Sequence, residues 1–117
     1  MLSACERMLG PQARCAAITL EEGMGRDDLA ALIQARLAEL GPSLVLVDML
    51  GGTPWNAALS KGLPEGVEVM AGLSMPLLLE ALELRDSLEA PRLGALLKAK
   101  GAAAVALASQ MLGGNTA

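Results

Sequence analysis

The stretch LVLVDMLGGTPWN, residues 44–56, decides the fold of this chain. Its first four residues form a continuous apolar run, which is typical of a central parallel strand that is covered on both faces. Gly51 and Gly52 allow a sharp turn, because glycine adopts backbone conformations that a Cβ atom disfavours. Thr53 then suits the cap of a helix, and Pro54 suits its first position. The stretch therefore predicts a strand, a turn and a helix in succession.

Helical and extended patterns alternate on either side of this stretch. The most regular helical pattern predicts one buried stripe, formed by Leu29, Leu32, Ile33, Leu37 and Leu40. The further helices are predicted at residues 2–9, 27–40, 76–84 and 91–100. The further strands are predicted at residues 15–20, 67–71 and 102–108. This alternation predicts an α/β fold with a wound, mainly parallel sheet and helices on both faces.

The run at residues 102–108 allows two interpretations. Its alanines favour a helix, whereas a short apolar run that follows Gly101 fits a last buried strand. We predict the strand. Residues 1–112 are expected to form one domain, and residues 113–117 a flexible tail.

Composition excludes several classes of function. The chain has 117 residues, a formal net charge of −4, one Trp and neither Phe nor Tyr, so it lacks the basic and aromatic surface that nucleic-acid binders use. No apolar run reaches the length of a membrane span, so no direct membrane insertion is expected. No secretory signal is recognised, so a cytoplasmic location is expected. Cys5 and Cys15 lack CxxC spacing, which predicts reduced thiols and no metal site.

The turn after residues 44–47 carries the chemistry. Asp48 follows the strand directly, and the carboxyl ends of strands in wound α/β sheets are where ligands bind. The glycine turn and the helix start after it provide N–H donors that suit an anion such as phosphate, and Asn56 adds a second polar group. The alternative is a plain connection, in which Gly51, Gly52 and Thr53 serve only the turn and the cap.

Two segments resemble the IIA components of the mannose and fructose family of sugar phosphotransferase systems. These are residues 44–58, LVLVDMLGGTPWNAA, and residues 67–82, VEVMAGLSMPLLLEAL, although Ser74 stands where asparagine is common. Residues 2–12 resemble the end of the family's first helix. The resemblance implies a domain that takes a phosphoryl group from the phosphocarrier protein onto a histidine and passes it to the IIB component. It implies no cofactor.

The resemblance also implies roles for individual residues. Asp48 would orient the histidine by accepting its other N–H, while Gly51, Gly52 and Thr53 would surround the phosphoryl oxygens. Residues implied for partner docking are Trp55, Asn56 and Ser74. Trp55 also fits a partly buried packing position, and Ser74 also fits a plain helix cap. For Met49 and Leu50 we weigh contact with a partner against core packing, and we predict core packing.

The chain contains no histidine. In the family, that residue follows the first, central strand in a segment of the kind strand-Ser-His-Gly, and the resemblance begins after it. The chain alone is therefore expected not to accept phosphate. The leading hypothesis is a IIA domain without this strand, from a start codon placed too late or a truncated gene. The slot left by the strand would be filled by rearrangement or by a second copy, and a homodimer is expected.

Two other hypotheses belong to different classes. The first is a non-catalytic binding or regulatory module that retains the turn and the docking surface. The second takes Asp48 as a phosphate acceptor, as in response-regulator receivers. The second is weaker, because an acidic pair after an earlier strand and a lysine after a late one are not visible. Glu83 and the charged stretch at residues 85–89 are expected to be solvated surface.

Overall fold

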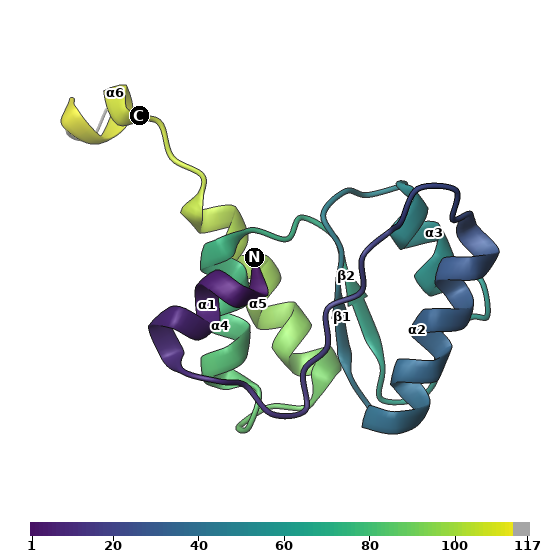
Figure 1. Ribbon diagram of the computed structural model, residues 1–117. Helices are drawn as coiled ribbons and strands as arrows, with labels where there is room; N and C mark the ends of the chain where they lie inside the picture. The colour runs from purple at the N-terminus through teal and green to yellow at the C-terminus, as the bar shows by residue number, and fades with distance from the viewer. Residues whose placement is uncertain (114–117) are drawn as a thin grey trace.

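The computed structural model describes residues 1–113 and shows helices on both sides of a short sheet (Figure 1). In chain order the elements are α1 (Leu2–Leu9), α2 (Arg26–Leu40), β1 (Leu44–Leu46), α3 (Thr53–Leu59), β2 (Glu68–Met70), α4 (Met75–Leu84), α5 (Ala90–Ala104) and α6 (Ala108–Leu112). The helices predicted at 2–9, 27–40, 76–84 and 91–100 and the strands predicted at 44–47 and 67–71 are confirmed, with ends that differ by a few residues. Of the predicted tail at 113–117, only Gly113 belongs to the described residues.

The two strands pair in parallel, with Val45 opposite Val69. Within residues 1–113 the sheet contains these two strands, so β1, predicted to be central, has one paired edge and one open edge. Pairing continues past the strand ends, where the Val47 N–H donates to the Met70 carbonyl at 2.9 Å. The predicted parallel arrangement is therefore confirmed.

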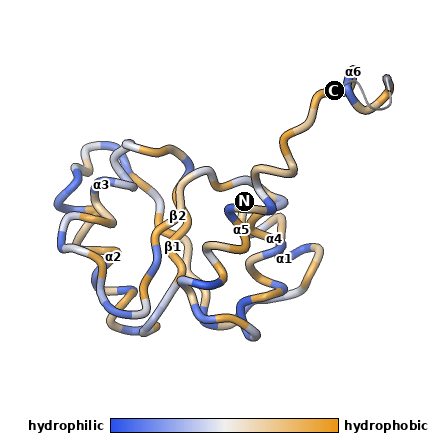
Figure 2. The backbone as a smooth tube through the Cα atoms, turned by 180° about the vertical axis from the view of Figure 1, so that it is seen from behind, coloured by the Kyte–Doolittle hydropathy of each residue, from blue (hydrophilic) through white to orange (hydrophobic). Residues whose placement is uncertain are grey.

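Alternating side chains of the strands enter two hydrophobic clusters. Val45 and Val69 pack with α2 and α3 on one face, where the buried residues are Leu29, Ala30, Ile33, Ala57 and Ala58. Leu44, Leu46 and Met70 pack with α4 and α5 on the other face, where the buried residues are Leu77, Ala81, Leu93 and Leu97. In Figure 2 the hydrophobic strand segments lie between these two groups of helices. Helices on both faces, as predicted, follow from the period of two along each strand.

Helix α1 packs on the outside of α4 and forms a third cluster. Cys5 of α1 is fully buried against Leu78 and Leu82 of α4. Gly10 ends α1, and its N–H donates to the Glu6 carbonyl at 2.7 Å. The N-terminal helix is thus anchored by one buried side to α4, and Leu46 of β1 packs against the same cluster.

The prediction of a strand at residues 15–20 is wrong. These residues form no strand, and only Cys15 and Ile18 among them are partly buried. Ile18 packs against the cluster that also receives Val45. A strand exists only when a neighbouring strand pairs with it. Across residues 1–113, β1 pairs with β2 alone, so this segment remains extended and unpaired.

The prediction of a strand at residues 102–108 is also wrong. Helix α5 continues to Ala104, and after a three-residue connection α6 begins at Ala108. Every residue of the predicted strand is exposed, including Val105 at 84%. Since no sheet covers this segment, the helix propensity of alanine favours the continuation of α5 through residues 102–104. Figure 1 shows the resulting arm projecting from the body.

Two local predictions are corrected by smaller amounts. Gly52, not Thr53, is the N-cap of α3, so the helix begins at Thr53, one residue earlier than predicted. Pro54 therefore occupies the second helical position and not the first. On α2, Leu29 and Ile33 are buried but Leu32 is exposed, so the stripe is narrower than predicted. No helix within residues 1–113 combines the length and the apolar character that crossing a membrane requires.

Candidate functional site

The carboxyl ends of β1 and β2 bring the two predicted site segments together. The Gly72 N–H donates to the Asp48 carbonyl at 3.1 Å, and the Leu73 N–H donates to the Val47 carbonyl at 3.0 Å. These bonds continue the parallel pairing past both strands. The turn that begins at Asp48 and the loop that leads to Ser74 therefore start side by side, at the edge where such sheets place their ligands.

The turn from Met49 to Gly52 is held by its own backbone. Gly51 has a φ of 82°, which a residue with a Cβ atom adopts only with strain. The Gly52 N–H donates to the Met49 carbonyl at 3.2 Å. The Asn56 side chain donates through Nδ2 to the Gly51 carbonyl at 3.1 Å and so ties the turn to the first turn of α3. The Asn56 amide group therefore stabilises the turn.

Several polar groups at this edge have no partner among residues 1–113. The Asp48 side chain is exposed, and its carboxylate makes no hydrogen bond or ion pair there. The backbone N–H groups of Gly51 and Thr53 are likewise unpaired within the described part of the chain. By contrast, the Gly52 N–H is already used inside the turn. An anion at this edge would find its donors at Gly51 and Thr53.

Ser74 serves as the cap of α4. Its Oγ accepts the N–H of Leu77 at 3.4 Å, and the side chain is half-buried. The structure thus gives Ser74 a structural contact of its own. The loop between β2 and α4 holds this cap beside the Asp48 turn.

Replacement of the cap gives a first testable prediction. Ser74→Ala is expected to lower the free energy of unfolding by about 1 kcal/mol, because one N–H of the first turn of α4 loses its partner. Urea unfolding followed by circular dichroism measures the loss. Ser87→Ala is the matched control, since Ser87 is exposed and its hydroxyl has no partner in residues 1–113. Equal stability of the two variants would contradict the capping role.

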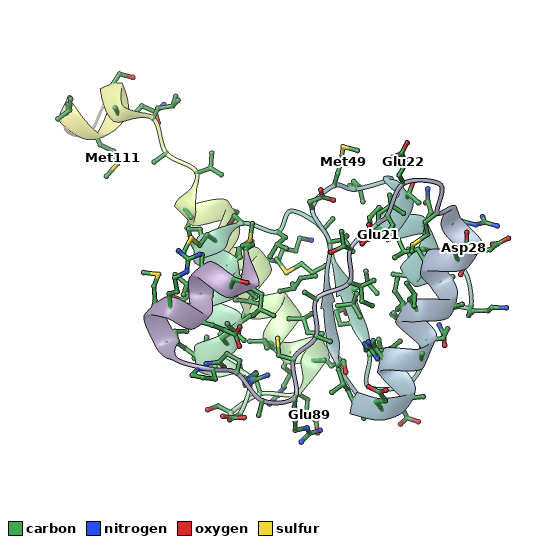
Figure 3. All side chains as sticks on the ribbon, viewed as in Figure 1. Glu21, Glu22, Asp28, Met49, Glu89 and Met111 are labelled. Carbon is green, nitrogen blue, oxygen red and sulfur yellow. The ribbon has the colours of Figure 1, made fainter. Side chains whose placement is uncertain are left out.

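The apolar residues of the turn divide into a packed one and two exposed ones. Trp55 is half-buried and packs against the cluster of α2 and α3, as the packing interpretation predicted. Met49 and Leu50 are 63% and 71% exposed, so the prediction of core packing is wrong for both. Figure 3 shows the Met49 side chain pointing outward from the turn. They are exposed because the turn carries them beyond the end of β1, where neither group of helices covers the chain.

Arg85 is an anchor that the sequence did not reveal. Its guanidinium donates to the carbonyls of Ala13 at 2.6 Å and Arg14 at 3.1 Å, and to the Oε1 atom of Gln12 at 3.1 Å. The side chain is half-buried, so the prediction of a solvated residue is wrong. Its partners lie more than 70 residues away in the sequence, beyond the range of any local pattern.

Comparisons with known proteins place these features in a family. Residues 1–98 match the family model described as "PTS system fructose IIA component". The chain is 37% identical over 90 residues to the "PTS system mannose-specific EIIAB component" of Escherichia coli K12, an alignment that covers 74% of this chain and 28% of that protein. The chain thus spans less than a third of the length of this curated relative.

Solved structures agree with this match. The phosphotransferase system component EIIA of Streptococcus agalactiae superposes with a TM-score of 0.82 at 26% identity, covering 93% of this chain and 87% of that one. The mannose/sorbose-specific IIA subunit of Enterococcus faecalis superposes with a TM-score of 0.76 at 30% identity, covering 91% of this chain and 82% of that one. The α/β fold is therefore that of these solved proteins over nearly the whole chain.

Proposed function

Because this chain belongs to the mannose-family IIA components of sugar phosphotransferase systems, we propose that its Asp48 edge is the supporting part of a phosphohistidine site. The site would relay a phosphoryl group from the phosphocarrier protein to the IIB component. The observation that carries the proposal is Asp48: its carboxylate has no partner within residues 1–113, and its backbone carbonyl accepts the Gly72 N–H, which holds the turn beside the loop to Ser74.

Each group at this edge has a chemical task in the relay. The Asp48 carboxylate accepts one imidazole N–H, which leaves the other ring nitrogen free to attack phosphorus. The N–H groups of Gly51 and Thr53 donate to the phosphoryl oxygens, and the Thr53 hydroxyl adds a third donor. Gly52 contributes to the turn through its bond to Met49. No cofactor takes part in this relay.

The imidazole itself is absent from the 117 residues. In the proposal it comes on a strand-Ser-His-Gly segment that pairs with the open edge of β1. The carboxyl end of such a strand would lie beside Asp48, because strands that pair in parallel have their carboxyl ends at the same end of the sheet. The open edge supports this placement, since β1 pairs only with β2 within the described residues.

The partners follow from the same relay. We propose the phosphocarrier protein and the IIB component as partners, a cytoplasmic location, and a homodimer as the oligomeric state. Trp55, Asn56 and Ser74 are the residues that we propose for contact with both partner proteins. The exposed apolar pair Met49 and Leu50 extends this docking surface.

The missing histidine favours a second candidate function. The chain would then be a binding or regulatory module that docks the phosphocarrier protein without accepting phosphate. Phosphate labelling separates the two candidates, because relay requires the label and a binding module does not.

The docking surface gives a second prediction. In the double variant Met49→Ser, Leu50→Ser the dissociation constant for the phosphocarrier protein is expected to rise about tenfold, because two apolar contacts are lost. Isothermal titration calorimetry with the purified partner measures it.

Leu63→Ser is the control for this experiment. Leu63 is 51% exposed, and it precedes β2. It therefore lies toward the amino-terminal end of the strands, opposite to the end that carries Asp48. Its replacement is expected to leave binding unchanged. An equal loss in both variants would show that the partner does not dock at the Asp48 edge.

A further inference from the structure

The fold brings the two cysteines of the chain into one cluster. Cys5 is fully buried on the inner side of α1, where it packs with Leu78 and Leu82 of α4. Cys15 is half-buried and packs against the same cluster, although a chain reversal separates it from Cys5. Neither thiol takes part in the proposed relay.

The chain between the two thiols is held at several points. The Gln12 N–H donates to Oε2 of Glu6 at 2.9 Å, which ties the segment after Gly10 to α1. Arg85, the C-cap residue of α4, donates hydrogen bonds to the carbonyls of Ala13 and Arg14, the two residues directly before Cys15. These contacts position Cys15 independently of its own side chain.

We propose that Cys5 and Cys15 form an intramolecular disulfide when the protein meets a small disulfide such as oxidised glutathione. The partly exposed Cys15 reacts first: its thiolate attacks one sulfur of the small disulfide and releases one glutathione thiolate. The Cys5 thiolate then attacks the Cys15 sulfur of this mixed disulfide and releases the second. Two protein thiols are oxidised, and one small disulfide is reduced to two thiols.

The electrostatics around Cys15 set the pH dependence of the first step. Burial raises the pKa of the Cys15 thiol, and the Arg85 guanidinium partly opposes this rise, while Glu6 and Cys5 add to it. Because the thiolate is the nucleophile, oxidation is expected to accelerate as the pH rises toward this pKa.

The experiment is oxidation of the full chain followed by digestion with trypsin without reduction. Trypsin cuts after Arg7, Arg14 and Arg26, so the disulfide joins peptide 1–7 to peptide 15–26. Mass spectrometry is expected to find this linked pair, with loss of two hydrogen atoms from the intact monomer and loss of both titratable thiols. Reduction returns the separate peptides. A glutathione adduct that persists on the wild-type chain, or a disulfide between two chains, would overturn the proposal.

Two variants and one condition serve as controls. Cys5→Ala is expected to stop at the glutathione adduct on Cys15, whereas Cys15→Ser is expected to remain unmodified, because the remaining thiol is buried. Starting from the glutathione adduct on Cys15, the folded chain is expected to form the linked pair at least about tenfold faster than the chain in urea, since the fold places both thiols in one cluster. Equal rates would show that the fold does not bring them together.

Discussion

Incubation of the 117-residue chain with phosphoenolpyruvate, enzyme I and the phosphocarrier protein is expected to leave it without acid-labile phosphate. Relay of this kind needs an imidazole nucleophile, and the chain has none. The measurement is incorporation of radioactive phosphate, followed by treatment with acid. An acid-labile, base-stable label on this chain would contradict the relay as proposed. A label that hydroxylamine removes would instead indicate an acyl phosphate, which is the result expected if Asp48 is the acceptor.

A longer chain supplies the matched positive control. Addition of an apolar strand that ends in Ser-His-Gly before Met1 is expected to restore about one phosphate per chain, because the strand places the imidazole beside Asp48. Replacement of the added histidine by alanine is expected to abolish the label. In the extended chain, Asp48→Asn is expected to slow labelling on the order of 100-fold, because an amide no longer fixes the reactive tautomer.

Truncation of Leu97 is expected to have the largest effect on stability. Leu97 of α5 is fully buried in the cluster that joins α4 and α5 to the sheet. Leu97→Ala removes its packing and leaves a cavity, so the free energy of unfolding is expected to fall by about 2–5 kcal/mol. This is a large part of the about 5–15 kcal/mol that holds a typical domain together. Urea unfolding measures the change.

The neighbouring residue provides the control for this truncation. Leu96 is 37% exposed on the same helix and differs from Leu97 mainly in burial. Leu96→Ala is expected to change the stability by at most about 1 kcal/mol. Equal losses in the two variants would show that burial in this cluster does not decide the stability of α5.

The elements predicted well are those whose signals are local and strong. The helix of residues 26–40 has two aspartates in its first turn, and Asp28 Oδ2 accepts the Gly25 N–H at 3.0 Å. The helix ends at Gly41, whose N–H donates to the Leu37 carbonyl at 2.8 Å. The strand at residues 44–47 was predicted from a run of β-forming residues that needs cover on both faces. In each case the residues that determine the element are within it or next to it.

The position of Asp48 at the end of β1 was predicted, but the details of the turn after it were not. That Asp48 would emerge at a strand end followed from the apolar run before it. The sequence did not predict that the Gly52 N–H is used inside the turn. It also did not predict that Met49 and Leu50 are exposed. Exposure depends on which helices cover the strand end, and that is a property of the assembled layers.

Local signals predict the strand, the turn and the helix start that follow one another from Leu44, because apolar runs, glycine freedom and proline at a helix start act over a few residues. Long-range packing explains why residues 15–20 remain unpaired, why residues 102–104 continue a helix, and why Arg85 anchors a segment more than 70 residues away. Pairing, burial and anchoring each need a partner brought from elsewhere in the chain. A short apolar run is compatible with both a strand and a helix, and the presence or absence of a pairing partner decides between them.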